Sequence, residues 1–195
     1  MPKVSILLLL LFTVPDVLVS QPPPEAQKML GLFDRLRAAD AARAAGHPQP
    51  VSFHLTGDEV NSYMRYSLRA TPRPGLDSVT VKFFDHNYVS IYSILDFDAV
   101  ERWKPGTIPS LLRPVLSGKK SIWTDFRIRA ENSKATLSVE KAYCNDIRLP
   151  AFLVEKMIAI VAARQPEHYD TSKPLPLPFG LREIHTTPQT INGSN

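Results

Sequence analysis

Residues 150–164 (PAFLVEKMIAIVAAR) carry the broadest apolar pattern in the chain. On a helical wheel of ~100° per residue, their large apolar side chains span an arc of roughly 160°. A helix that lies on one flat layer needs an apolar stripe of only about 100°. The pattern therefore predicts a helix over 150–164 with apolar cover on more than one side. The arc is formed by Leu153, Val154, Met157, Ile158, Ile160 and Val161, and Phe152 extends it.

Two more helices are predicted nearer the start of the chain. Residues 25–45 repeat apolar side chains on one face at helical spacing. Residues 51–55 alternate as a short, half-buried strand. Thr56 and Glu59 then have the Thr-x-x-Glu spacing of a capping box, which predicts a helix that opens at Gly57. The expected inward face of this helix consists of Val60, Tyr63, Met64, Ser67 and Leu68.

The middle of the chain has the pattern of two antiparallel hairpins. The expected strands are residues 76–84, 88–97, 121–130 and 134–143, and a polar turn joins each pair. Residues 88–97 carry apolar side chains on both faces, which indicates a strand covered on one side and partly sheltered on the other. Residues 98–118 are less regular, with a short helix or an apolar loop expected at 109–116. Residues 179–184 and 186–191 can add short closing strands.

These elements predict an α+β fold. We expect a curved antiparallel sheet of two main hairpins plus short edge strands, wrapped around the apolar helix. The N-terminal amphipathic helix and the capped helix would pack alongside. The expected segments are a signal peptide at 1–20, a flexible exit and amphipathic helix at 21–50, a single α+β domain at 51–191 and a polar tail at 192–195.

The first 20 residues have the pattern of an export signal. Lys3 supplies a positive start, residues 4–14 form an uninterrupted apolar run, and Ser20 is a small residue suited to a cleavage site. The apolar run is shorter than the roughly 17–25 residues of a membrane span. We therefore expect a periplasmic or secreted protein after cleavage near Ser20, and an uncleaved anchor is the alternative.

The charge of the chain indicates which partners it suits, and its cysteine content shows whether it can form a disulfide. The 195 residues include 23 basic and 19 acidic side chains, and loss of Lys3 and Asp16 with the signal peptide leaves the net charge at +4. This mild excess suits an anionic envelope or phospholipid head groups, and it does not predict a nucleic-acid partner. Cys144 is the single cysteine, so it cannot form an internal disulfide, and we expect it to be buried as a small apolar side chain.

The sequence lacks a recognisable catalytic set. None of the five histidines pairs with another at metal-ligand spacing. His168 and Asp170 lie two residues apart and could contact a metal, and Asp96 and Asp98 have the spacing of paired carboxylates, but a solvated loop is the favoured interpretation of each pair. We therefore expect no catalytic residues, no metal site and no cofactor. An exported hydrolase is a third hypothesis, which requires Asp96, Asp98 and a histidine to meet.

The strand expected at 121–130 has one apolar and one polar face, as in an antiparallel sheet with one wet side. Trp123, Arg127 and Arg129 share the polar face. Together they could contact phosphate head groups at a membrane surface. The other interpretation is an ordinary solvated face that protects the sheet from aggregation. The sequence leaves both interpretations open.

Three short segments, HLTGDEVNSYM, RLPAFLVEKMIAIV and PLPFGLREIHTT, follow the export signal in that order. With them the chain resembles small exported bacterial proteins of unknown function, some of which are related to the tubular lipid-binding fold. The resemblance covers residues 51–191. It implies a curved antiparallel sheet that wraps a helix and leaves an apolar groove, without catalytic residues. Because this chain is shorter than the full tubular modules, a closed lipid tunnel is not expected.

We therefore expect a non-enzymatic exported domain that binds a lipid or another apolar molecule in the cell envelope. The expected groove lies between the apolar helix, the capped helix and the inner side of the sheet. Its residues are Tyr63, Met64, Leu68, Leu153, Met157, Ile160 and Val161. The alternative is a structural or protein-interaction module with a filled core and an envelope protein as its partner.

Overall fold

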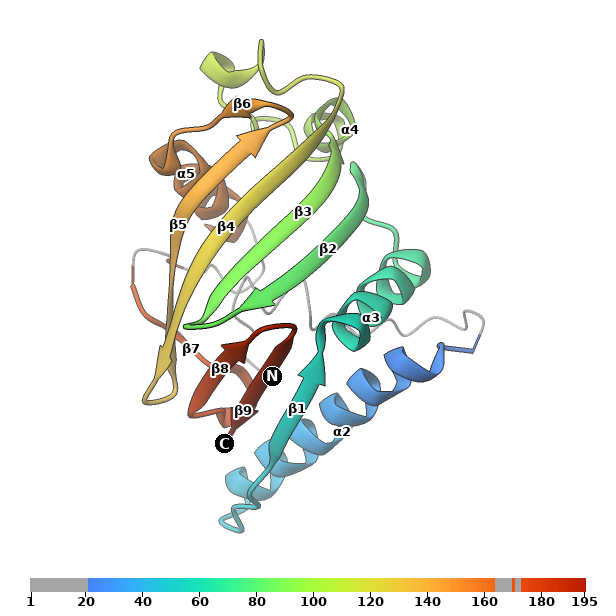
Figure 1. Ribbon diagram of the computed structural model, residues 1–195, viewed down its shortest axis with the longest axis vertical. Helices are drawn as coiled ribbons and strands as arrows, with labels where there is room; N and C mark the ends of the chain where they lie inside the picture. Colours follow the sequence, from blue (N-terminus) through green and yellow to red (C-terminus); the bar gives the residue numbers. More distant parts are fainter. Residues whose placement is uncertain (1–20, 164–169, 171–172) are drawn as a thin grey trace.

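Two antiparallel sheets form the frame of the molecule (Figure 1), seen in a computed structural model that describes residues 21–163, 170 and 173–195. The larger sheet has the order β2-β3-β4-β5-β6, and β7 also pairs with β5. Its strands are β2 (Leu76–Phe84), β3 (Tyr88–Asp96), β4 (Lys119–Glu131), β5 (Lys134–Cys144), β6 (Ile147–Arg148) and β7 (Leu175–Pro176). The smaller sheet has the order β1-β9-β8, with β1 (Ser52–Thr56), β8 (Glu183–Thr187) and β9 (Thr190–Ser194).

Four α-helices accompany these sheets in the described part of the chain. They are α2 (Pro24–Ala44), α3 (Gly57–Ala70), α4 (Phe97–Trp103) and α5 (Ala151–Ala163), and two short 3-10 helices are η1 (Ser110–Leu112) and η2 (Pro178–Gly180). The predicted α+β class and both predicted hairpins are confirmed. The predicted signal peptide at 1–20 and His168 lie outside the described residues.

The start of α3 follows directly from local sequence. The Thr56 side chain accepts a hydrogen bond from the Glu59 amide (3.3 Å), and the Glu59 carboxylate accepts one from the Thr56 amide (2.7 Å). This is the predicted capping box. The Lys28 ammonium of α2 also lies 2.6 Å from the Glu59 carboxylate. The same carboxylate therefore caps α3 and ties α2 to it.

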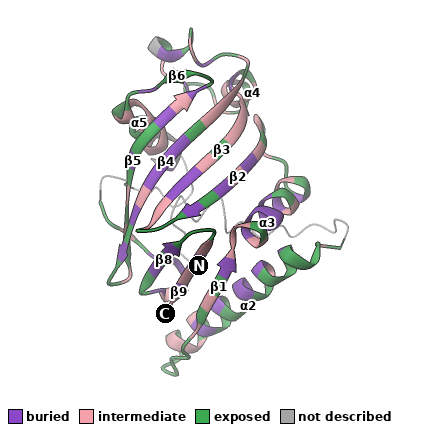
Figure 2. Ribbon diagram, in the orientation of Figure 1, coloured by how far each residue is buried: buried purple, intermediate pink, exposed green. Residues whose placement is uncertain are grey.

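Apolar side chains of the helices and of the small sheet pack against one face of the large sheet, which we call the inner face. Figure 2 shows that buried residues alternate with more exposed ones along β2, as expected for side chains that point to opposite faces. Two apolar clusters lie on the inner face. The first joins α2, α3 and the small sheet to Val79, Val81, Phe83, Val89 and Ile128. The second joins α4, η1 and α5 to Phe126, Val139, Ala142 and Cys144.

The predicted apolar helix is present as α5, and it lies behind β5 in Figure 1. Leu153, Val154, Met157 and Ile158 are each half-buried against the second cluster. Phe152 keeps 65% of its surface exposed. Within the described residues the large sheet is neither closed nor curled, so α5 rests against one part of an open sheet. The apolar side chains of α5 are therefore only half-buried, and the sheet does not wrap around the helix as expected.

The end of the chain differs from the expected polar tail at 192–195. Residues 190–194 instead form β9, the central strand of the small sheet, between β1 and β8. Gly193 is required there, because a Cβ atom at this position would lie 2.5 Å from the Phe53 ring. The segment (TINGS) has little apolar alternation, so its strand conformation depends on the backbone pairing that its two neighbours supply.

Helix α4 is a second departure from the sequence prediction, which expected an irregular exit after residue 97. The Asp96 carboxylate accepts a hydrogen bond from the Ala99 amide (3.0 Å) and so caps α4. Phe97 is buried in the second cluster. Asp96 is thus explained by helix capping, as acidic residues at helix starts usually are.

Strand β2 is an edge strand, and its neighbours cover its free backbone groups. The buried Asn61 of α3 donates to the Val81 carbonyl (2.9 Å) and accepts from the Val81 amide (2.7 Å). The Gln189 amide donates to the Phe83 carbonyl (3.1 Å), and the Thr186 hydroxyl donates to the Phe84 carbonyl (2.5 Å). The edge of the sheet is thereby protected from pairing with another chain.

Candidate functional site

The other face of the large sheet, which we call the outer face, points away from the two apolar clusters. Cross-strand partners in an antiparallel sheet point to the same side, so the pairing of β2, β3, β4 and β5 defines this face. Neither apolar cluster includes one of its residues. Its central part carries Lys82, Phe84, Tyr88, Ser90, Tyr92, Trp123, Asp125, Arg127, Arg129, Lys141 and Tyr143, and Glu131 and Lys134 lie opposite each other at its end.

Three aromatic side chains form a row across the outer face. Trp123 of β4 lies opposite Tyr92 of β3 on one side and Tyr143 of β5 on the other. The Trp123 and Tyr143 ring centroids are 5.9 Å apart. Tyr92 is 46% exposed and Trp123 is 49% exposed, so this row presents large aromatic surfaces to solvent. We call these three residues the aromatic row.

Asp125 lies beneath the aromatic side chains and is only 5% exposed. Its carboxylate accepts hydrogen bonds from the Tyr88 hydroxyl (2.7 Å), the Trp123 indole N–H (2.8 Å) and the Ser90 hydroxyl. A buried carboxylate needs such partners, because removing an ion from water without compensation is costly. All three donors belong to the outer face. The carboxylate therefore fixes the orientation of the rings around it.

The Tyr88 hydroxyl is held in its donating form. Burial, followed by the hydrogen bond to Asp125 and the negative charges of Asp125 and Glu140, raises the pKa of Tyr88 to about 12. The Arg127 guanidinium lies 5.7 Å from the centre of the Tyr88 ring and 3.2 Å from the Glu140 carboxylate. Arg127 and Glu140 therefore balance each other next to the buried network.

A register shift in the β4–β5 pairing brings Glu140 to this network. Asp125 pairs with Lys141 and the next residue, Phe126, pairs with Val139, so Glu140 is the extra residue of a bulge. Bulges re-aim side chains locally, and here the bulge lets Glu140 reach Arg127. In the central part of the outer face, the cations Lys82, Arg129 and Lys141 make no ion pair with any residue that the structure describes, whereas at its end Lys134 lies opposite Glu131. The exposed, unbalanced charge of this face is positive.

The predicted head-group residues Trp123, Arg127 and Arg129 do share one face, as the alternation along β4 indicated. Their neighbours Tyr92, Tyr143 and Lys141 were not predicted, because they come from other strands. Alternation shows which residues of one strand share a face, whereas the register between strands decides which of them become neighbours. The buried acceptor Asp125 was likewise missed as a central group, because it looked like one more polar residue of a wet strand.

The residues predicted to line an apolar groove are divided between the two clusters. Tyr63 and Met64 are buried in the first cluster, and Leu68 packs against it. The Tyr63 ring contacts Phe33 of α2 edge-on, with centroids 5.2 Å apart, so α2 covers this face of α3. Leu153 and Met157 pack against the second cluster. The side chains of Ile160 and Val161 lie outside the described part of the structure.

Cys144 is buried, as predicted, with 1% of its surface exposed. Burial raises the pKa of its thiol, which keeps the less reactive protonated form at neutral pH. Its thiol donates a long hydrogen bond to the Val115 carbonyl, with the sulfur 4.0 Å from the oxygen. Cys144 thus acts as a small apolar side chain of the second cluster.

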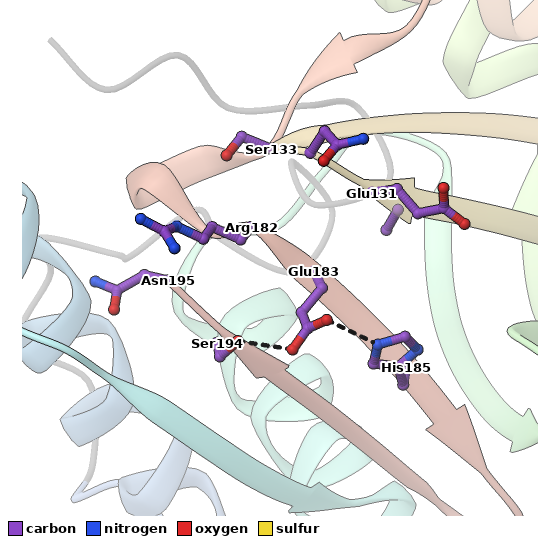
Figure 3. A pocket seen from close by; sticks show the side chains of 9 residues that line it. Glu131, Ser133, Arg182, Glu183, His185, Ser194 and Asn195 are labelled. Atoms are coloured by element: carbon purple, nitrogen blue, oxygen red, sulfur yellow. Dashed lines mark hydrogen bonds and ion pairs between the residues drawn. The ribbon is translucent and has the colours of Figure 1, made fainter.

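A polar pocket of about 700 Å³ lies between the β4–β5 turn and the β8–β9 hairpin (Figure 3). Its Glu183 carboxylate accepts hydrogen bonds from the Ser194 hydroxyl (2.9 Å) and from the His185 ring (3.2 Å). These hydrogen bonds hold the pKa of Glu183 below its usual range, which makes it a weak base. In hydrolases the histidine contacts the serine, whereas here the carboxylate separates them. This arrangement does not activate Ser194 as a nucleophile.

Among the described residues, no group of three or more His, Cys, Asp or Glu side chains is placed to hold a metal ion. No helix in this part of the chain is both long enough and apolar enough to cross a membrane. Comparison of the chain with protein-family models, with curated proteins and with solved structures finds no match.

Proposed function

We propose that this chain is a non-enzymatic exported domain that binds lipid in the cell envelope through the outer face of its large sheet. The observation that carries the proposal is the aromatic row, which offers exposed Trp and Tyr surfaces on a sheet face beside cationic side chains. Trp and Tyr are favoured at membrane–water interfaces because their rings are apolar while their N–H and O–H groups stay hydrated. The predicted export signal agrees with a function in the cell envelope.

The pairs that would support a hydrolase are occupied in other ways. Asp96 caps α4, and Glu183 separates Ser194 from His185. A binding role also agrees with the rigidity of the outer face. Asp125 holds Tyr88 and Trp123 in place before any ligand arrives, so less conformational freedom is lost on binding.

A direct test uses the two tryptophans of the chain, Trp103 and Trp123. Trp103→Phe leaves Trp123 as the only tryptophan, and Trp123→Phe leaves Trp103, which is 54% exposed on α4. Each variant is mixed with vesicles of phosphatidylcholine and phosphatidylglycerol, and tryptophan emission is recorded. We expect a blue shift for the chain that keeps Trp123, because its indole leaves water, and no shift for the chain that keeps Trp103.

Two results would contradict the proposal. If neither variant binds the vesicles in a sedimentation assay, the chain does not bind lipid surfaces. If only the variant that keeps Trp103 shifts, the contact lies at α4 and not on the outer face. Circular dichroism of both variants shows whether each one keeps the fold.

The half-buried side chains of α5 favour a second candidate, the apolar groove expected from the sequence. Leu153, Met157 and the exposed Phe152 would contact a single lipid or another apolar molecule beside the second cluster. Native mass spectrometry followed by organic extraction tests this candidate. A co-purifying lipid, or uptake of an added fatty acid, is the expected result. Absence of both would leave α5 as a purely structural helix.

A further inference from the structure

We propose that the outer face binds bilayers that carry anionic head groups, with Lys82, Arg129 and Lys141 as the side chains that contact the lipid phosphates. This inference rests on the lipid-binding function proposed above and names the class of lipid surface. It follows from how the charges of the outer face are paired.

Both carboxylates near the aromatic row are already neutralised or withdrawn from solvent. Asp125 is 5% exposed and accepts three hydrogen bonds, so it presents little negative charge at the surface. Glu140 pairs with Arg127. Lys82, Arg129 and Lys141 are exposed and make no ion pair with a described residue. Lys82 and Lys141 lie at the two ends of the Ser90–Asp125 row next to the aromatic row, and Arg129 lies further along β4 in the same direction. An approaching surface therefore meets positive charge on one side of the aromatic row.

The three cations come from different strands, β2, β4 and β5. Neighbouring strands are about 4.8 Å apart, so the span from β2 to β5 is roughly 14 Å. A flat anionic layer can contact all three together while the aromatic row, which lies beside them on the same face, also meets the layer. A single phosphate can reach only part of this spacing. The arrangement thus favours an extended anionic surface, and a phospholipid bilayer is such a surface.

Arg127 has a different role from the one expected for it. Its guanidinium donates hydrogen bonds to the Glu140 carboxylate and to the His86 carbonyl (3.4 Å). It also lies over the Tyr88 ring. Loss of Arg127 would leave the negative charge of Glu140 unbalanced on the outer face. We therefore assign Arg127 as a positioning residue and the three unpaired cations as the contact residues.

The test compares the full chain with two triple variants of equal net charge. The first, K82Q/R129Q/K141Q, removes the contact cations. The matched control, R35Q/R65Q/R69Q, removes three exposed cations from α2 and α3. Binding is measured by sedimentation with vesicles of phosphatidylcholine alone and of phosphatidylcholine mixed with phosphatidylglycerol. Each basic side chain near an anionic membrane strengthens binding about fivefold, so the first variant should lose on the order of 100-fold and the control should bind like the unchanged chain.

The salt dependence of the unchanged chain gives a second measurement that does not depend on how well a variant folds. Binding to anionic vesicles should weaken as salt rises from low to physiological concentration, since the screening length falls from about 30 Å at 0.01 M to about 8 Å at 0.15 M. Equal binding to both vesicle types at every salt concentration would overturn the anionic preference and leave the lipid-binding function intact. Binding to neither would overturn both. Equal losses in the two triple variants would show that net charge, and not the outer face, drives binding.

Discussion

The two faces of the large sheet are built from the same four strands and yet reach burial in different ways. On the inner face, Val81, Phe83 and Phe126 are buried by helices and by the small sheet, which come from distant parts of the chain. On the outer face, Asp125 is buried by its own cross-strand and same-strand neighbours. The inner face is an apolar core, and the outer face is a hydrogen-bonded polar centre under exposed rings. This difference indicates that the inner face provides stability and leaves the outer face available for binding.

The largest expected effect is a loss of stability, and it should differ between two adjacent residues of β2 that point to opposite faces. Phe83 is 4% exposed on the inner face and Phe84 is 42% exposed on the outer face. Phe83→Ala should lower the free energy of unfolding by about 3–5 kcal/mol, because it leaves a cavity in the first cluster. Phe84→Ala should cost less than half as much, since much of its ring is already exposed to solvent and meets the Tyr88 ring edge-on. Equal losses in chemical denaturation would contradict the assignment of the two faces.

The next effect concerns the polar centre of the outer face. Asp125→Ala leaves the Tyr88, Ser90 and Trp123 donors without their acceptor, which should cost about 1–3 kcal/mol. It should also loosen the Trp123 ring, which near-ultraviolet circular dichroism detects in a Trp103→Phe background. Ser138→Ala, at an exposed position of β5, is the matched control and should change stability by less than about 0.5 kcal/mol. An unchanged indole signal in the Asp125 variant would show that the carboxylate does not fix the ring.

The smallest expected effect lies where α3 joins the inner face. Burial acts to raise the pKa of Glu59, but the hydrogen bonds from Lys28 and Thr56 outweigh it and hold that pKa below its usual value of 4.5. Because the folded-state pKa is the lower one, the stabilisation is present above pH 4.5 and is lost as pH falls through the folded-state value. Glu59→Gln should therefore cost about 1 kcal/mol at pH 7 and less at acidic pH. Denaturation at both pH values measures this, and a cost independent of pH would show that the charge of Glu59 does not matter.

Local signals predicted those elements whose stabilising contacts are close in sequence. The capping box of α3 needs only Thr56 and Glu59, and each hairpin needs two alternating strands with a polar turn. The second closing strand was expected at 186–191, whereas β9 runs from Thr190 to Ser194, because its position depends on pairing with β1, more than a hundred residues away in the chain. Helix α4 was missed because Asp96 was interpreted as a strand end when it also serves as a cap.

The candidate site was predictable only in part. Alternation placed Trp123, Arg127 and Arg129 on one face, and the structure agrees. Their neighbours Tyr92, Tyr143 and Lys141 come from other strands, so their position depends on the register and on the bulge after Asp125. The residues predicted to line a groove were, by contrast, not brought together by the structure. Helical spacing correctly predicted that α3 and α5 have apolar faces, but it could not show that α2 would cover α3.

The sequence by itself determined the α+β class, the capped helix, the two hairpins and the apolar character of α5, because each depends on residue patterns within short segments. Only the tertiary structure decided that the sheet stays open, that the helices gather on its inner face, and that Asp125 organises the rings of the outer face. These features depend on contacts between strands and helices that are far apart in the chain. Their geometry is set by register and packing, which a one-dimensional pattern does not contain.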